Sequence, residues 1–208
     1  MRLAANNAQW LPWEKPFNHR YADNMSLVVS DGEMVSPPIG FPSFVMYRDG
    51  HVEFRNVARD ELLTNVLHAV SGWEMILKDG NILTKNTPDG AMPRTVYGLS
   101  KDKRYLTICA IDGRQPDYSM GATPYEACEW MLYFGADSAM NVDGGGSATL
   151  ICWDSEPDSA NTDPKSKDTP NLHKLNHQDG NHERAVGCNI GFYFVKGAAP
   201  LGLTHQKP

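Results

Sequence analysis

The sequence predicts an α/β (α+β) fold, a single domain in which helices flank a curved mixed β-sheet. Seven Asp-Gly pairs punctuate the chain, and several separate short apolar runs, which is the pattern of β-hairpins. Two segments carry helical signals, and apolar strand-like runs precede and follow them. The 208 residues contain no internal repeat and no separate linker, so we expect one domain over residues 1–208.

The first half of the chain predicts two hairpins followed by a helix. The hairpins join residues 25–30 to 33–35 and residues 43–48 to 51–55. Apolar residues then recur at helical spacing from Asp60 to Val70, and Gly72 offers a C-terminal stop. A short strand over residues 75–77 returns the chain to the sheet.

The middle of the chain predicts a strand pair and a capped helix. Residues 95–99 and 105–111 form the pair, and the second run is so apolar that we expect a central strand covered on both faces. Thr123-Pro124-Tyr125-Glu126 combines an N-cap, a Pro at the first helical position and a Glu three residues later, which is a capping box. Gly135 ends this helix.

The last third predicts three segments around a glycine loop. Strands are expected over residues 138–142 and 148–153, and a last strand over residues 185–195. Residues 154–182 are polar and rich in Pro, Asn, Asp and Lys, so we expect a long surface loop there.

Composition excludes several classes of protein. Hydrophobic residues make up 41% and charged residues 21% of the chain, as in globular proteins, and no apolar run reaches the ~20 residues of a membrane span. The net charge of −6 argues against a nucleic-acid partner. Residues 1–7 do not resemble a signal peptide. We therefore expect a cytoplasmic protein, or a secreted or periplasmic one if an export signal precedes this sequence.

The cysteines indicate neither a metal site nor a disulfide framework. Cys109, Cys128, Cys152 and Cys188 are widely spaced, with no Cys-x-x-Cys pair. Three of them lie in apolar strand-like runs, which predicts buried thiols, while disulfides stay open for an exported protein. His173, His177 and His182 lie with acidic residues in the polar segment, where a solvated loop is the simpler interpretation than a metal site.

The glycine loop is the most informative stretch of the sequence. Asp143 precedes Gly144, Gly145 and Gly146, and Ser147 follows them. Glycines allow a ligand to approach the bare backbone, and successive N–H groups in such a loop form an anion site. The alternative is a tight turn between strands, although three consecutive glycines exceed what a hairpin needs.

Five motifs, read in order, resemble those of the phosphodiester glycosidase family. They are residues 93–98 (PRTVYG), 110–114 (AIDGR), the helix from Thr123, residues 139–147 (AMNVDGGGS) and residues 183–186 (ERAV). The resemblance extends from about Ser26 to Val195. Further strands usually precede this region in the family, which implies that this chain is shortened or belongs to a divergent branch. The family also has an early Asn, which Asn6 or Asn7 matches.

The resemblance implies cleavage of the bond between a sugar's anomeric carbon and a phosphodiester, on a glycan or a cell-surface polymer. A phosphomonoester leaves easily when cations hold its charge, and guanidinium groups grip phosphate in a bidentate way. We expect the phosphate and substrate to be bound by Arg94, Thr95, Arg114, Gly144, Gly145, Gly146, Ser147, Arg184 and Asn7. The expected catalytic carboxylate is Asp143, with Asp112 and Glu183 as further candidates. For each Arg a surface ion pair is the alternative, and for Asp112 a turn residue.

Two other functions stay open at this point. The chain could bind anionic polysaccharide without catalysis, or it could be a metal-dependent phosphodiesterase that cuts the P–O bond. We expect no cofactor, and nothing in the sequence supports a divalent metal ion. Among the tryptophans, Trp10 and Trp13 lie in a Pro-containing segment and are the best candidates to contact a sugar.

Overall fold

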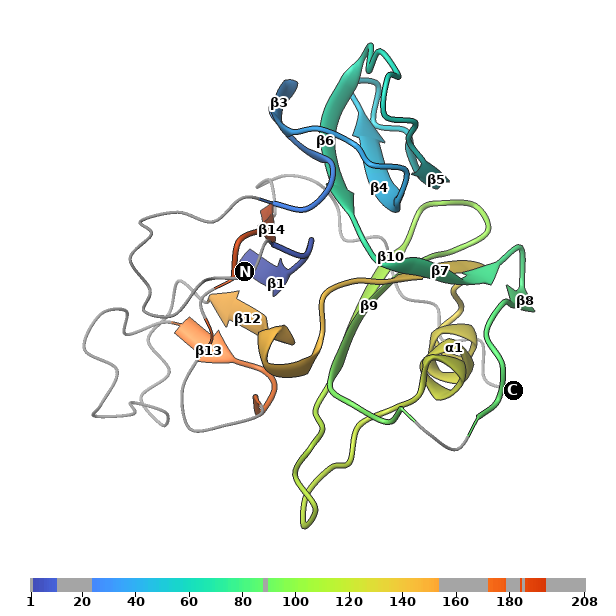
Figure 1. Cartoon of the computed structure of the whole chain (residues 1–208), viewed down its shortest axis with the longest axis vertical. Coiled ribbons are helices and arrows are strands. Elements are labelled where there is room, and N and C mark those ends of the chain that lie inside the picture. The colour runs from blue at the N-terminus through green and yellow to red at the C-terminus, as the bar shows by residue number, and fades with distance from the viewer. Residues whose placement is uncertain are drawn as a thin grey trace.

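The structure is a computed structural model that describes residues 2–10, 24–87, 90–153, 172–178, 184 and 186–193. Within these ranges the strands form three sheets, every strand pairing is antiparallel, and there is one α-helix (Figure 1). The predicted mixed sheet flanked by helices is therefore wrong, and the protein is mostly β. No helix in these ranges is long and apolar enough to span a membrane.

The first sheet, which we call the hairpin sheet, has the order β3-β2-β6-β4-β5. Its strands are β2 (Val28–Ser30), β3 (Glu33–Ser36), β4 (Pro42–Tyr47), β5 (Val52–Asn56) and β6 (Val66–Ser71). Both predicted hairpins are confirmed. Asp31 and Gly32 both have positive φ, 51° and 81°, which matches the twist of a tight hairpin.

The helix predicted from Asp60 to Val70 is wrong. Its second half is β6, which pairs with β2 on one side and β4 on the other. Its first half leaves Leu62 83% exposed. Pairing on both sides buries Val66 and Val70, and β-branched residues suit that setting, so tertiary contacts override the local periodicity.

The second sheet, the helix-backed sheet, has the order β10-β9-β11-β7-β8. Its strands are β7 (Glu74–Lys78), β8 (Asn81–Ile82), β9 (Arg94–Leu99), β10 (Leu106–Ile111) and β11 (Ser138–Asn141). β10 was expected to be a central strand, but it lies at the edge of this sheet, and all six of its residues are partly exposed. Its apolar sequence therefore does not reflect burial on both sides.

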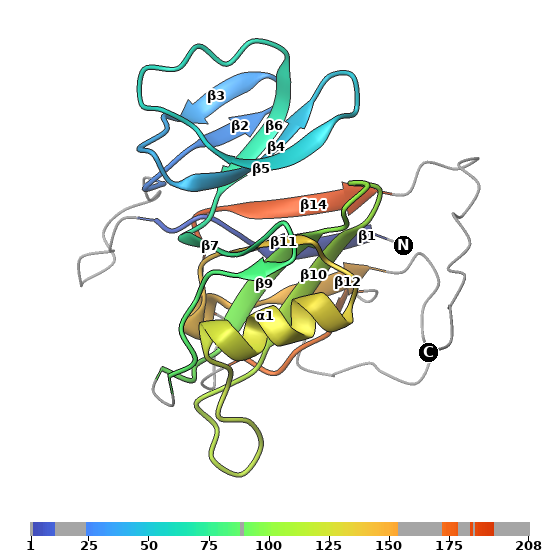
Figure 2. The same cartoon turned by 90° about the vertical axis from the view of Figure 1, so that its right-hand side faces the viewer.

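Helix α1 (Pro124–Tyr133) confirms the predicted capping box. The Thr123 hydroxyl accepts a hydrogen bond from the Glu126 backbone, and the Glu126 carboxylate accepts one from the Thr123 backbone at 2.7 Å. Ala127, Cys128 and Met131 are buried against the sheet. Figure 2 shows α1 lying along the sheet beneath β9 and β10.

The third sheet, the terminal sheet, has the order β13-β12-β1-β14. Its strands are β1 (Arg2–Asn6), β12 (Leu150–Trp153), β13 (Leu172–Lys174) and β14 (Asn189–Tyr193). β14 confirms the predicted last strand over its own residues. The expected loop of residues 154–182 is corrected at β13, which pairs with β12, while residues 154–171 and 179–182 lie outside the described residues.

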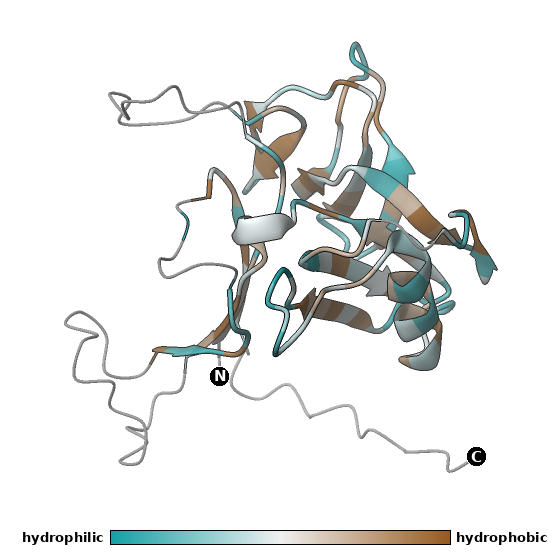
Figure 3. Cartoon of the chain, turned by 60° about the horizontal axis from the view of Figure 1, so that its bottom comes forward, coloured by the Kyte–Doolittle hydropathy of each residue, from teal (hydrophilic) through white to brown (hydrophobic). Residues whose placement is uncertain are grey.

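One core joins the three sheets. It contains Ala5 from β1, Phe44 and Val70 from the hairpin sheet, and Tyr97 and Met140 from the helix-backed sheet. Figure 3 shows hydrophobic stretches on strands in the interior of the molecule, while strands, helix and turns all carry hydrophilic residues as well. Because β1 lies between β12 and β14, this core brings the residues after β1 next to the glycine loop.

Candidate functional site

The glycine loop connects β11 to β12 through a short 3-10 helix, η1 (Gly145–Ser147). Gly145 has a φ of +61°, and its N–H donates to the Pro93 carbonyl at 2.8 Å. A Cβ on Gly144 would lie 2.6 Å from that same carbonyl oxygen. The loop therefore packs directly on the start of β9, and only glycine fits there.

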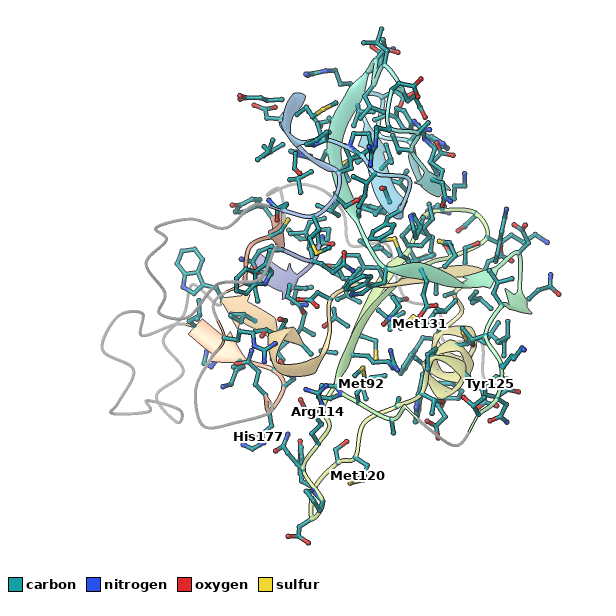
Figure 4. All side chains as sticks on the ribbon, in the orientation of Figure 1. Met92, Arg114, Met120, Tyr125, Met131 and His177 are labelled. Atoms are coloured by element: carbon teal, nitrogen blue, oxygen red, sulfur yellow. The ribbon has the colours of Figure 1, made fainter. Side chains whose placement is uncertain are left out.

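Two guanidinium groups lie against the bare backbone of this loop. A Cβ on Gly145 would be 3.1 Å from Nη1 of Arg114, and a Cβ on Gly146 would be 2.7 Å from Nη2 of Arg184. In the view of Figure 4, Arg114 and His177 both lie away from α1. The missing glycine side chains thus leave room for two cations, which segments 70 residues apart contribute.

Arg94, the third predicted arginine, points elsewhere. Its Nε donates to the Ala122 carbonyl at 2.5 Å, and its Nη2 donates to the Gly90 carbonyl at 2.9 Å. Burial lowers the pKa of Arg94. The bonds hold the segments before β9 and α1 together, and they commit Arg94 to the backbone rather than to the glycine loop.

Asp143 begins the loop with a partly buried carboxylate. Its Oδ1 accepts a hydrogen bond from the Gly144 N–H at 3.0 Å. Burial raises the pKa of Asp143, whereas hydrogen bonds from Ser147, Gly144 and Trp73 and the charge of Arg184 act in the opposite direction. A carboxylate whose pKa is raised beside a cation is typical of sites that transfer protons or attack a substrate.

The side chain of Asn6 holds the main chain at Asp143 in place. Its Nδ2 donates to the Asp143 carbonyl at 2.6 Å, while its Oδ1 accepts from Thr95 Oγ1 at 2.7 Å and from Thr149 N at 3.0 Å. Tyr97 donates to the Asn6 carbonyl at 2.9 Å. Thr95, which was predicted to contact substrate, is fully buried and bound to Asn6.

Asn7 follows Asn6 in the chain but makes different contacts. Its backbone carbonyl accepts from the Asp143 N–H at 3.1 Å. Its side chain is 1% exposed, and neither amide atom has a hydrogen-bond partner within the described residues. Leaving a buried polar group unmatched costs about 1–3 kcal/mol, and the contact of Asn7 with substrate stays a prediction, because the side chain is enclosed in this structure.

Asp112, a further candidate for the catalytic carboxylate, lies in a separate hydrogen-bond network. Its carboxylate accepts from Asn176 Nδ2 at 2.9 Å, from the His177 N–H at 2.9 Å and from Tyr118 at 3.2 Å. Asn176 also donates to the Ala148 carbonyl at 3.0 Å. Asp112 therefore connects the segment after β13 to the end of the glycine loop.

Gln178 and Trp73 are two residues of the site that the sequence analysis did not select as functional. Gln178 is buried, its Nε2 donates to Thr149 Oγ1 and to the Gly146 carbonyl, and its Oε1 has no partner within the described residues. Trp73 is 43% exposed, and its indole lies 2.6 Å from the Gln9 amide. No sequence pattern in the polar segment around Gln178 identifies this residue as functional. Trp73, directly after Gly72, has the sequence context of an ordinary core residue.

The structure describes some of the remaining predicted residues and not others. Ser147 is buried in η1 and Gly144 is partly exposed. Glu183, Trp13 and His182 lie outside the described residues. Trp10 forms a bridge with Asn24 next to the described end of β1. All four cysteines are free, and Cys128, Cys152 and Cys188 are buried. Of the three cysteines in apolar strand-like runs, Cys152 and Cys188 are buried as predicted, whereas Cys109 is partly exposed. Across the described ranges no three His, Cys, Asp or Glu side chains come together as a metal site.

The raised pKa of Asp143 predicts a pH-dependent gain in stability for Asp143→Asn. An acid whose pKa is higher in the folded state binds more protons there, so its ionisation destabilises the fold as the pH rises through the interval between the unfolded and folded pKa values. Asn cannot ionise. We expect the melting temperature of Asp143→Asn, relative to wild type, to increase from about pH 3.5, which is near the usual pKa of an Asp side chain, to about pH 7. A difference that stays constant with pH would contradict the raised pKa.

The site combines an acidic residue and two guanidinium groups around a side-chain-free loop on an antiparallel β scaffold, an arrangement chemically suited to an anionic ligand. The sequence profile of the phosphodiester glycosidase family matches residues 14–193. The chain therefore belongs to the phosphodiester glycosidase family, as its motifs predicted. No curated protein sequence matches the chain.

A solved structure shares the fold. The catalytic domain of zebrafish N-acetylglucosamine-1-phosphodiester α-N-acetylglucosaminidase, auto-inhibited by its pro-peptide, matches with a TM-score of 0.58 and 23% identity, over 71% of this chain and 52% of that one. The chain thus spans about half the length of the zebrafish domain. A hypothetical protein from Synechocystis matches with a TM-score of 0.46 and 10% identity, over 71% of this chain and 46% of the other.

Proposed function

We propose that the protein hydrolyses the bond between a sugar's anomeric carbon and a phosphodiester, releasing the free sugar and a phosphomonoester. Membership of the phosphodiester glycosidase family supports the reaction class. The observation that carries the proposal is the position of Asp143 at the start of a loop whose bare backbone is covered by Arg114 and Arg184.

In this proposal the two arginines hold the phosphate. Guanidinium groups form paired hydrogen bonds with phosphate oxygens and stabilise the negative charge that develops as the glycosidic bond breaks. A phosphate held in this way is a good leaving group, so the reaction does not depend on a strong general acid. The N–H groups of Gly144, Gly145 and Ser147 already donate to Asp143 Oδ1, the Pro93 carbonyl and the Gly144 carbonyl, so in this proposal the arginines rather than the loop backbone hold the phosphate.

Asp143 acts on the sugar side. Its ionised carboxylate either attacks the anomeric carbon or removes a proton from the attacking water, and the charge of Arg184 favours the ionised form. Trp73, exposed beside Asp143, offers an indole face against which the C–H face of a sugar ring can pack.

Hydrolysis in ¹⁸O-labelled water tests the bond that is cut. A methyl phosphodiester of N-acetylglucosamine 1-phosphate is a suitable first substrate because the name of the zebrafish neighbour carries that sugar. We expect the label in the sugar hydroxyl at the anomeric carbon and none in methyl phosphate. Label in the phosphate would instead identify a phosphodiesterase that cuts the P–O bond. No turnover of this substrate or of its glucose, galactose and mannose counterparts, with binding retained, would favour a polysaccharide-binding module.

A further inference from the structure

The helix-backed sheet has an open edge at β10. Among the described strands β10 pairs only with β9, so the hydrogen-bonding groups on its other side have no strand partner there. Proteins protect such edges with Lys, Pro, bulges or a covering element. β10 reads Leu-Thr-Ile-Cys-Ala-Ile and contains no charged residue and no Pro. It is therefore suited to pair with another strand.

A group of exposed aromatic side chains lies beside this edge. Trp130, Tyr133 and Phe134 of the α1 end are 52%, 79% and 53% exposed, and their ring centroids lie 5.4–6.2 Å from one another. A groove of about 710 Å³ runs between them and the β10 residues Cys109 and Ile111. An apolar surface of this kind, adjacent to an open strand edge, is typical of a protein interface.

The charges at the two ends of β10 are opposite in sign. The turn before it carries Lys101, Lys103 and Arg104 against a single acid, Asp102. Beyond its other end lies Asp112, and Glu126 and Glu129 line the groove between α1 and this half of β10. Arg114 also follows this end, but its guanidinium lies against the glycine loop. An identical strand in the opposite direction would place each charged end beside its complement.

We propose that β10 pairs antiparallel with β10 of a second copy of this chain, across a twofold axis, so that the two helix-backed sheets form one continuous sheet. A twofold interface must be self-complementary, and the charge gradient along β10 meets that requirement. The aromatic groups of the two copies then lie on the same face of the joined sheet, on either side of the shared strands.

Cross-strand pairs select the register. With the axis at Ile108, Arg104 lies opposite Asp112 of the second copy, and Leu106 lies opposite Ala110. Moving the axis to Cys109 would place Arg104 opposite Arg114 and Leu106 opposite Asp112, which opposes like charges and buries a carboxylate against a leucine. The pairing therefore centres on Ile108.

The Ile108 register predicts a specific cross-link. Thr107 of one copy then lies opposite Cys109 of the other, on the same face of the sheet. We expect Thr107→Cys to form a covalent dimer when it is oxidised with copper phenanthroline, and the added substitution Cys109→Ser to abolish it. Within one strand these two positions lie about 7 Å apart, too far for a disulfide. A dimer linked through Cys109 alone in wild type would overturn the Ile108 register.

Sedimentation velocity tests the association itself. We expect wild type to sediment as a dimer and Trp130→Glu to shift towards the monomer, because the aromatic group would carry a buried charge. Leu62→Glu is the matched control, since Leu62 is 83% exposed in the connection before β6, and it should remain dimeric. A monomeric wild type overturns the proposal. If deletion of residues 194–208 from that monomer then produces dimers, this segment rather than a second copy occupies the edge of β10. A dimer that Thr107→Cys fails to cross-link overturns it as well.

Discussion

Asp143→Asn should reduce the hydrolysis of a glycosyl phosphodiester by at least about 10²-fold, the lower end of what a general acid or base contributes. Asn has the shape of Asp, and its Oδ1 can still accept the 3.0 Å hydrogen bond from the Gly144 N–H. The substitution therefore removes the negative charge and leaves the loop intact. The measurement is kcat at the pH optimum of the wild type, together with the Kd of inorganic phosphate.

Phosphate binding separates catalysis from simple recognition. Because Arg114 and Arg184 remain in place, Asp143→Asn should bind phosphate at least as tightly as wild type, since one repelling charge is gone. Asp117→Asn is the matched control: it makes the same charge change on an exposed side chain and should keep full activity. An Asp143→Asn protein with wild-type kcat would remove Asp143 from the mechanism.

Asn6→Ala should lower the free energy of unfolding by roughly 3 to 5 kcal/mol. The substitution leaves the Asp143 carbonyl, the Thr95 hydroxyl and the Thr149 N–H without their buried partner, and each unmatched group costs about 1–3 kcal/mol. For a chain of this size the melting temperature should fall by about 10 °C. Thermal denaturation followed by circular dichroism measures it.

An exposed amide supplies the control for this prediction. Asn81 donates one hydrogen bond, at 3.0 Å, to the Asp79 carbonyl in an exposed turn. Asn81→Ala should change stability by less than about 0.5 kcal/mol. If the melting temperatures of Asn6→Ala and Asn81→Ala differed by only a degree or two, the hydrogen bonds of the Asn6 side chain would not be what holds the glycine loop to β9 and β12.

Elements defined by neighbouring residues could be predicted from the sequence. The hairpin turn at Asp31-Gly32 and the capping box at Thr123 depend on contacts that span four residues or fewer, and both are present. The helix predicted from Asp60 to Val70 failed because those residues share an apolar spacing with β6, whose strand pairing comes from β2 and β4. The edge position of β10 likewise depends on which strands pair, which no local pattern encodes.

The candidate site shows the same division. The sequence by itself determined the family and the glycine loop with its flanking carboxylate, because a run of glycines after an apolar strand is a local signal. Only the tertiary structure decided that Arg114 and Arg184 lie against that loop while Arg94 binds the Ala122 and Gly90 carbonyls. It also selected Asn6, whose bond to Asp143 joins residues 137 positions apart. Such contacts depend on how β1 inserts between β12 and β14, and strand order is a property of the whole packed core rather than of any one segment.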